Sequence, residues 1–201
     1  MKSEALRRAK ESFAIEAKAV MDVLEYMDFD AFGKAVEVMS HCDRVATSGC
    51  GHSGIACMHF AHSLCCIDRP ARFISPSEAV HGGMGFIQER DVMLLASRGG
   101  KTEELMPILR ICALKKAVVI GITENLDSPL AKQSDIVLPM QIKKETDKYN
   151  SQSTSSFVTL SAILDALQVA LIEEINYENE QFAVIHPGGA VGERLNHFLI
   201  P

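Results

Sequence analysis

The 201-residue sequence predicts a doubly wound α/β domain in which helices flank a five-stranded parallel sheet, preceded by N-terminal helices. Three observations support this fold class. Short β-type runs alternate with helical segments from residue 43 onward, several runs are continuously apolar, and the length suits one domain. Continuous apolar runs are typical of parallel strands that helices cover on both faces.

The first part of the chain is expected to be helical. Apolar side chains from Phe13 to Leu24 recur at three- and four-residue spacings, and Asp30 is a candidate cap for a second helix. We therefore divide the chain into an N-terminal helical extension, 1–42, and a domain, 43–201, on which it packs.

The remaining elements follow from alternating β-type and helical patterns. Parallel strands joined by right-handed crossovers bring their carboxyl ends to one edge of the sheet, where the loops bind ligands. The expected strands are 44–48, 71–74, 91–96, 117–122 and 135–138, and the expected helices are about 53–66, 103–115, 128–133 and 155–175.

Composition narrows the class of partners and the compartment. The chain has 20 Lys and Arg against 26 Asp and Glu, and no basic run longer than two, so we expect no nucleic-acid partner. No apolar stretch reaches 18 residues, which argues against a membrane span. Six cysteines with neither a C-x-x-C pair nor a signal peptide predict free thiols in a cytoplasmic protein.

The loop after the first expected strand matches G-x-G-x-x-G at Gly49, Gly51 and Gly54. A dinucleotide site also needs an acidic residue near the end of the second strand. That strand is followed by Ser75, and the first acidic residue after the strand is Glu78, which lies too far on. NAD binding is therefore a minor alternative. Alternatively, the glycines only permit a tight turn from strand to helix.

The loop after the third expected strand imitates the end of a Walker A loop at Gly100-Lys101-Thr102. The first glycine of that motif is missing, because Leu95 occupies its position, so a P-loop is excluded. Backbone N–H groups at a helix start, with the hydroxyls of Ser97 and Thr102, nevertheless suit a phosphate. The alternative is a plain helix cap by Thr102.

A third hydroxyl-rich loop, 153–156, precedes the final helix, and three such loops at strand ends favour a phosphorylated small molecule. A zinc site is a minor alternative for His52, His59 and His62, which helical spacing places on one face together with Cys65. Spacing alone supplies no complete ligand set, so we expect no metal.

These motifs together resemble known sugar-phosphate enzymes. The glycine turn, the loop from Ser97 to Glu104 and the Ser/Thr loop resemble the sugar isomerase (SIS) domain, which has a flavodoxin-like fold. The segments Glu78–Gly82 and His186–Gly192 resemble the KpsF/GutQ family of arabinose-5-phosphate isomerases, and the HPGGAxG motif in the second is the most discriminating. The resemblance runs from about residue 1 to residue 195.

The resemblance implies aldose–ketose isomerisation of a phosphosugar through an enediol, without a cofactor. It assigns Glu145 as the general base, His186 to ring opening or proton relay, and His81 to polarising or positioning the substrate. A carboxylate shielded in a closed pocket has its pKa raised, which suits a base. The phosphosugar is then expected on Ser48, Gly49, Ser53, Ser97, Gly100, Lys101, Thr102, Ser153, Thr154, Ser155 and Ser156.

Two positions depart from the family pattern. His52, counted here among the catalytic residues, stands where the family has Lys, and Lys101 stands where it has Glu. Our hypothesis is that Lys101 partly replaces the missing positive charge. The alternative function is a sugar-phosphate-binding sensor or regulatory protein with impaired catalysis.

The resemblance also concerns assembly and regulation. It implies a homo-oligomer, a dimer or a tetramer, whose sites borrow residues from neighbouring subunits. Many family members continue after the HPGG segment into a pair of CBS regulatory domains. Because this sequence ends at Pro201, we expect no CBS domains.

Overall fold

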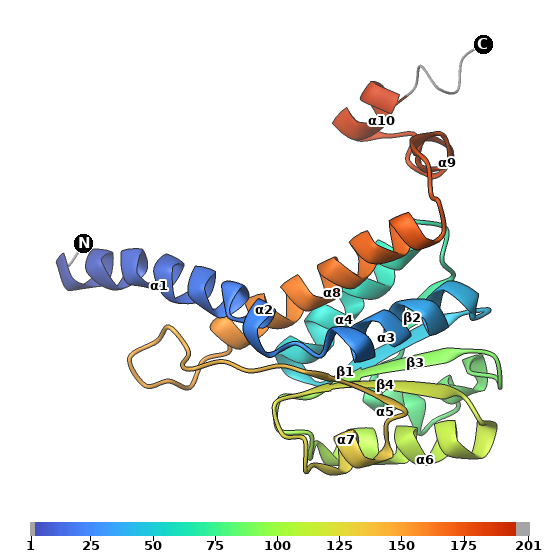
Figure 1. Cartoon of the computed structure of the whole chain (residues 1–201), viewed down its shortest axis with the longest axis horizontal. Coiled ribbons are helices and arrows are strands. Elements are labelled where there is room, and N and C mark those ends of the chain that lie inside the picture. The colour runs from blue at the N-terminus through green and yellow to red at the C-terminus, as the bar shows by residue number, and fades with distance from the viewer. Residues whose placement is uncertain (1–2, 196–201) are drawn as a thin grey trace.

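The computed structural model describes residues 3–195 and confirms the predicted α/β fold class (Figure 1). Five strands form one parallel sheet in the order β2-β1-β3-β4-β5. In this doubly wound order the direction in which successive strands are added to the sheet reverses between β1 and β3. Ligands bind at this point in such sheets. The strands are β1 (Val45–Gly49), β2 (Ala71–Phe73), β3 (Val92–Ala96), β4 (Val118–Thr123) and β5 (Ile136–Pro139).

The central strands are buried along their whole length because helices cover both faces of the sheet. All five residues of β1 and all five of β3 are buried. The hydroxyl of Thr47 donates to the carbonyl of Cys57 at 2.7 Å, which satisfies a polar group inside an apolar layer. Gly49 pairs with Ala96, so β1 and β3 end level with each other and deliver their loops to one place.

Helices α3 (Phe29–His41), α4 (Gly51–Cys65) and α8 (Ser155–Glu174) cover one face of the sheet (Figure 1). The apolar stripe of α8, including Leu160, Leu164 and Leu167, lies in the larger core cluster. By length and composition alone α8 is also apolar enough to cross a membrane, although no uninterrupted apolar stretch in it reaches 18 residues. Its apolar composition is explained by its position as a core helix, because it packs against α3 and α4.

The opposite face carries shorter helices. The second core cluster joins Leu95 of β3 to Leu105 and Ile108. The expected helix 103–115 is confirmed in position but begins as a 3-10 turn. The elements on this face are α5 (Pro76–Ala79), α6 (Met106–Lys115), α7 (Pro129–Gln133) and the 3-10 helices η1 (Gly83–Phe86) and η2 (Glu103–Leu105).

The N-terminal helices differ in how they pack. Helix α1 (Ser3–Met21) extends away from the sheet and is followed by the short α2 (Val23–Tyr26), whereas α3 contributes to the core (Figure 1). The prediction that Asp30 caps α3 is wrong by two residues, because the cap is Asp28. The carboxylate of Asp28 accepts the N–H groups of Asp30 and Ala31, both at 3.0 Å, so Asp30 lies in the first turn. The domain boundary at residue 42 stays a prediction.

The last two described helices, α9 (Asn179–Ile185) and α10 (Gly189–Leu195), follow the C-terminal end of α8. Figure 1 shows them beyond that end, whereas α1 and the long loop between β5 and α8 lie at the other end. A helix of 20 residues is about 30 Å long, so the two groups of elements are well separated.

Candidate active site

The glycine turn after β1 is shaped by close contact between strand and helix. A Cβ on Gly54 would lie 2.5 Å from the carbonyl oxygen of Gly49, and Gly51 has a positive φ of 55°. Both requirements exclude larger residues, because a side chain would collide or be strained. The turn therefore has a structural explanation in this fold. It leaves the side chain of Ser53 half-buried within the first turn of α4.

The loop after β3 folds on its own hydroxyl groups. The Oγ of Ser97 lies 2.7 Å from the Oγ1 of Thr102 and accepts the N–H of Gly100 at 3.1 Å. Thr102 begins η2 but its side chain makes no capping hydrogen bond, so the plain-cap alternative is wrong. Gly100 has a φ of 64°, and a Cβ there would overlap the Oγ of Ser128 at 2.0 Å. Lys101 is exposed beside this compact loop.

Glu145 is the buried carboxylate of this edge of the sheet, and its side chain is only 1% exposed. Its Oε2 accepts the backbone N–H of Thr154 at 2.9 Å, the hydroxyl of Thr154 at 3.2 Å and the N–H of Ser156 at 3.1 Å. Its own N–H donates to the Oδ1 of Asn150 at 2.6 Å. The start of α8 thus holds the carboxylate in one orientation.

The ionisation of Glu145 differs from the expectation of a raised pKa. Burial acts to raise the pKa of this carboxyl, but hydrogen bonds from Ser156 and Thr154 outweigh it, so the pKa lies below its ordinary value. Hydrogen bonds to the charged form stabilise that form. In this state Glu145 is an ionised carboxylate that is ready to accept a proton, although a weaker base than expected.

Arg98 and Glu124 were missed by the sequence reasoning. The Nη1 of Arg98 donates to the Oε1 of Glu145 at 2.8 Å, and its Nε donates to the Oε2 of Glu124 at 2.7 Å. Arg98 directly follows Ser97 in the loop after β3, and Glu124 directly follows β4. The available signal was a cation and an acid at the carboxyl ends of adjacent strands, β3 and β4.

The start of α8 also brings His52 into this region. The ring of His52, on the exposed side of the first turn of α4, lies edge-on to Phe157 with ring centroids 6.0 Å apart. Ser153 is half-buried, and the buried hydroxyls of Ser48 and Ser155 find no hydrogen-bond partner among residues 3–195. Buried hydroxyls without partners cost stability, so each calls for an explanation, and a bound ligand is one of them.

The two remaining predicted histidines are not gathered with Glu145 in one chain. His81 is exposed and follows α5, beyond the carboxyl end of the edge strand β2. His186 ends α9, past the far end of α8, with its ring 5.0 Å from that of Phe182. The Nδ1 of His186 is buried and finds no partner within the described residues. The distance along α8 separates His186 from Glu145.

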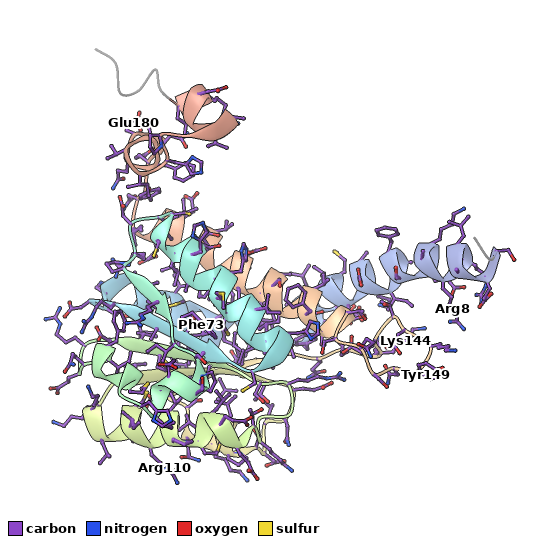
Figure 2. All side chains as sticks on the ribbon, turned by 180° about the vertical axis from the view of Figure 1, so that it is seen from behind. Arg8, Phe73, Arg110, Lys144, Tyr149 and Glu180 are labelled. Atoms are coloured by element: carbon purple, nitrogen blue, oxygen red, sulfur yellow. The ribbon has the colours of Figure 1, made fainter. Side chains whose placement is uncertain are left out.

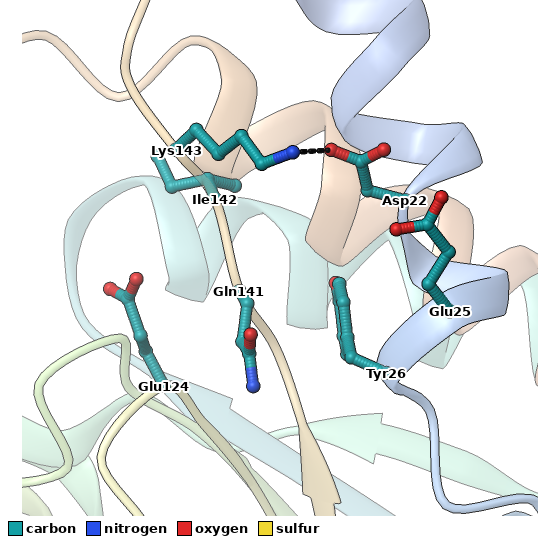
Figure 3. Close-up of a pocket in the computed structure, with 7 residues that line it drawn as sticks. All are labelled: Asp22, Glu25, Tyr26, Glu124, Gln141, Ile142 and Lys143. Carbon is teal, nitrogen blue, oxygen red and sulfur yellow. Dashed lines mark ion pairs between the residues drawn. The ribbon is translucent and has the colours of Figure 1, made fainter.

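Two cavities flank the segment that carries Glu145. One, of about 580 Å³, lies between α1 and the loop around Glu145, and Figure 2 shows Lys144 and Tyr149 of this loop near α1, which carries Arg8. The other, of about 500 Å³, includes Glu124 and the Lys143–Asp22 ion pair of 3.3 Å (Figure 3). Neither is lined by the Ser97 loop or by the glycine turn.

The zinc alternative finds no support in the part of the chain that the structure describes. Across residues 3–195, no three His, Cys, Asp or Glu side chains come together as a metal-binding group. His59 lies instead 3.7 Å from Asp165 of α8, and His62 lies 3.7 Å from the sulfur of Cys66. All three histidines of α4 are exposed.

Two curated proteins are similar to this chain over most of its length. The arabinose 5-phosphate isomerase KdsD of Pseudomonas aeruginosa is 35% identical over 191 residues, which cover 94% of this chain and 58% of that protein. The arabinose 5-phosphate isomerase GutQ of Salmonella typhimurium is 36% identical over 167 residues, covering 83% and 52%. The chain spans little more than half the length of these curated relatives.

Two solved structures are similar to this chain over more than nine-tenths of its length. A protein of Listeria monocytogenes, provisionally described as a sugar-phosphate isomerase, is 40% identical with a TM-score of 0.91, covering 94% of this chain and 100% of that one. An Escherichia coli protein in complex with A5P is 28% identical with a TM-score of 0.86, covering 93% and 100%. Residues 38–170 match the SIS domain. The chain therefore belongs to the SIS domain family, as its motifs predicted.

Proposed function

We propose that this chain is a phosphosugar aldose–ketose isomerase that interconverts arabinose 5-phosphate and ribulose 5-phosphate. The observation that carries the proposal is the buried, ionised carboxylate of Glu145, which is held at the start of α8 near the hydroxyl-rich loops of the sheet edge. The names of the curated relatives and the A5P complex of a structural neighbour support the same substrate.

The proposed chemistry moves one proton between two carbons. The Glu145 carboxylate takes the proton from C2 of the open-chain aldose, and the electrons of that C–H bond form the C1–C2 double bond while the C1 carbonyl oxygen gains a proton. An acid supplies the proton of the C1 oxygen. The enediol then returns the proton of its C2 hydroxyl to that group as the C2 carbonyl forms, and C1 receives the carbon-bound proton back from Glu145. An acid that protonates the carbonyl oxygen stabilises the developing negative charge.

The phosphate is proposed to bind the loops after β1 and β3 and before α8. Support comes from Ser97 and Thr102, whose hydroxyls lie together beside the N–H of Gly100, and from the unpartnered hydroxyls of Ser48 and Ser155. Backbone N–H groups and hydroxyls of this kind bind phosphate without a full positive charge. Lys101 and His52, both exposed, are then free to contact the phosphate or the sugar from the open side.

A complete site is proposed to need a second copy of the chain. His186 is separated from Glu145 by the length of α8, so in one chain it has no access to the carbonyl that Glu145 serves. Exposed apolar side chains on α4, such as Ile55 and Met58, offer a surface for a neighbouring subunit. We propose a homo-oligomer in which His186 of one copy faces Glu145 of another.

We also propose a cytoplasmic location. All six cysteines are free, which suits a reducing compartment, and sugar phosphates are charged metabolites of the cell interior.

The test is a coupled assay of the purified protein with arabinose 5-phosphate, measuring the appearance of ribulose 5-phosphate, alongside a panel of pentose and hexose phosphates. We expect turnover of arabinose 5-phosphate with a higher kcat/KM than for any hexose phosphate. Tight binding of phosphosugars with no interconversion of any of them would contradict the proposal and favour a sensor.

A further inference from the structure

Arg98 connects two carboxylates that differ in their exposure to solvent. Its guanidinium donates to Glu124 at 2.7 Å and to Glu145 at 2.8 Å. The side chain of Glu124 is 33% exposed, that of Arg98 is 40% exposed and that of Glu145 is 1% exposed. A half-exposed cation therefore reaches inward and pairs with the one carboxylate that the proposed reaction uses.

The end of β4 holds Arg98 by its backbone as well as by its side chain. The carbonyl of Arg98 accepts the N–H of Glu124 and the hydroxyl of Thr123, both at 3.0 Å. The Nε–Glu124 bond adds a third connection to the same strand end. With these groups in place, the Nη1 of the planar guanidinium has a defined direction toward Glu145, because a guanidinium offers its donors in a rigid fork.

The two oxygens of Glu145 are not equivalent. A carboxylate has about four acceptor positions, two on each oxygen. Oε2 already accepts three hydrogen bonds, two from Thr154 and one from the N–H of Ser156, whereas Oε1 accepts the bond from Arg98. The hydroxyl of Ser156 also interacts with this carboxylate. Oε1 is thus the oxygen with remaining capacity to accept a proton.

We propose that Oε1 of Glu145 is the atom that accepts the substrate proton and that Arg98, anchored by Glu124, is the residue that positions this atom. The inference rests on the proposed isomerase function and deepens it. Arg98 acts through Glu145 and does not bind the phosphate.

The charges on every side of Glu145 bear on its ionisation. Arg98 is the cation in direct contact, and Glu124 lies behind it. The cavity on the other side, which Glu145 also lines, carries charged side chains of both signs. They are Arg7, Arg8, Glu11, Lys144, Asp147 and Lys148. Four of these side chains are cations and two are anions, but Arg98 is the cation whose guanidinium donates directly to the carboxylate, so loss of Arg98 is expected to raise the pKa of Glu145.

The first experiment measures the kinetics of Arg98→Ala and Arg98→Lys with arabinose 5-phosphate. We expect kcat of Arg98→Ala to fall about 100-fold, the effect of misplacing a reacting group by roughly 1 Å, with KM changed little. The acid limb of the kcat profile should shift to higher pH. Arg98→Lys should keep part of the activity and of the profile, because it retains the charge without the fork.

Two controls separate positioning from a loss of structure. Arg110→Ala removes an arginine from the exposed side of α6, away from the Glu145 loop (Figure 2), and should leave kcat, KM and the pH profile unchanged. Guanidinium ion added to Arg98→Ala should restore part of kcat and should not affect Arg110→Ala. Circular dichroism checks the fold of each variant, and Arg98→Lys carries the comparison if Arg98→Ala does not fold.

An unchanged kcat in Arg98→Ala, or a raised KM with unchanged kcat, would overturn the proposal, since the second result identifies a phosphate ligand. The proposed function and this inference fail separately. If the wild-type protein turns over no phosphosugar, the function fails, whereas the ion pair is still tested by NMR titration of ¹³C-labelled Glu145 without substrate. A pKa of Glu145 that is the same in wild type and Arg98→Ala would refute the pairing itself.

Discussion

The two ends of α8 carry the two halves of the proposed site and are built differently. At the N-terminal end, Glu145 is enclosed by hydrogen bonds from Thr154, Ser156 and Arg98. At the C-terminal end, the Nδ1 of His186 is buried without a partner within residues 3–195, and the side chains of Val184 and Ile185 are 64% and 43% exposed. At the N-terminal end the carboxylate has its hydrogen-bond partners within a single chain. The C-terminal end leaves apolar side chains exposed and a buried nitrogen without a partner, and these groups are available for a further contact.

This difference shows which part of the function a single chain can support. The start of α8 fixes a carboxylate because backbone N–H groups there need acceptors and the helix dipole favours a negative charge. Its far end lacks such a constraint on α9, because a cavity of about 190 Å³ lies between α9 and the residues Cys66, Ile172 and Tyr177. We therefore expect changes at the N-terminal end to affect chemistry, and changes at the C-terminal end to depend on assembly.

The strongest test of the N-terminal end is Glu145→Gln. The amide keeps the shape but cannot take the proton from C2, so kcat should fall about 1,000- to 10,000-fold with little change in KM. The assay is the conversion of arabinose 5-phosphate to ribulose 5-phosphate. Glu174→Gln, an exposed change in the last turn of α8, is the matched control and should keep wild-type kcat. A Glu145→Gln enzyme with wild-type kcat would remove Glu145 from the chemistry.

Core packing along α8 gives the next largest difference. Leu167 is fully buried in the larger core cluster, so Leu167→Ala should lower the free energy of unfolding by about 2–5 kcal/mol. Val184→Ala, on the exposed side of α9, should change it by less than about 0.5 kcal/mol. Urea unfolding followed by circular dichroism measures both. A large loss in Val184→Ala at high protein concentration would show that a subunit contact buries this side chain.

The C-terminal end is tested by His186→Ala. If His186 serves a site on another copy, the variant should lose about 100-fold in kcat, the lower part of the range for an acid–base group. Co-expression of His186→Ala with Glu145→Gln, under different affinity tags, should yield mixed oligomers that regain activity, because one of their shared sites has both residues intact. Mixed oligomers as inactive as either parent would show that the two residues act within one chain.

Patterns in the sequence predicted the sheet well because apolar strands and helix stripes reflect burial that the chain carries locally. The glycine turn at Gly49 and Gly54 and the Ser97 loop were also predicted, because the ends of the strands can be recognised in the sequence and are followed by Ser and Thr residues. Arg98 and Glu124 were missed because Arg98 pairs with Glu124 and Glu145, which lie 26 and 47 positions further along the chain. The capping of α3 by Asp28 was missed for a different, local reason: Asp28 and Asp30 lie within one turn, and either residue type suits a cap.

The direction of the Glu145 pKa could not be predicted from the sequence either. Burial was expected to dominate, but the donors that lower the pKa come from Ser156 and Thr154, whose backbone N–H groups every helix start exposes. Residue type does not show where those groups point. The role of each predicted histidine depends likewise on distances in space, which for His186 include, in the proposed assembly, a second copy of the chain.

The smallest expected effect concerns stability at acid pH. The pKa of Glu145 is lower in the folded protein than its ordinary value of about 4.5, so its ionised form contributes stability that is present above that pH. This contribution is lost as the pH falls through the folded pKa. The free energy of unfolding of wild type should therefore exceed that of Glu145→Gln at about pH 7, and the two should converge toward about pH 3. Glu174→Gln, at the other end of α8, should follow wild type throughout, because its carboxylate is exposed. Urea unfolding across this range gives the comparison, and a difference between wild type and Glu145→Gln that grew toward acid pH would mean that burial, not hydrogen bonding, controls this carboxyl.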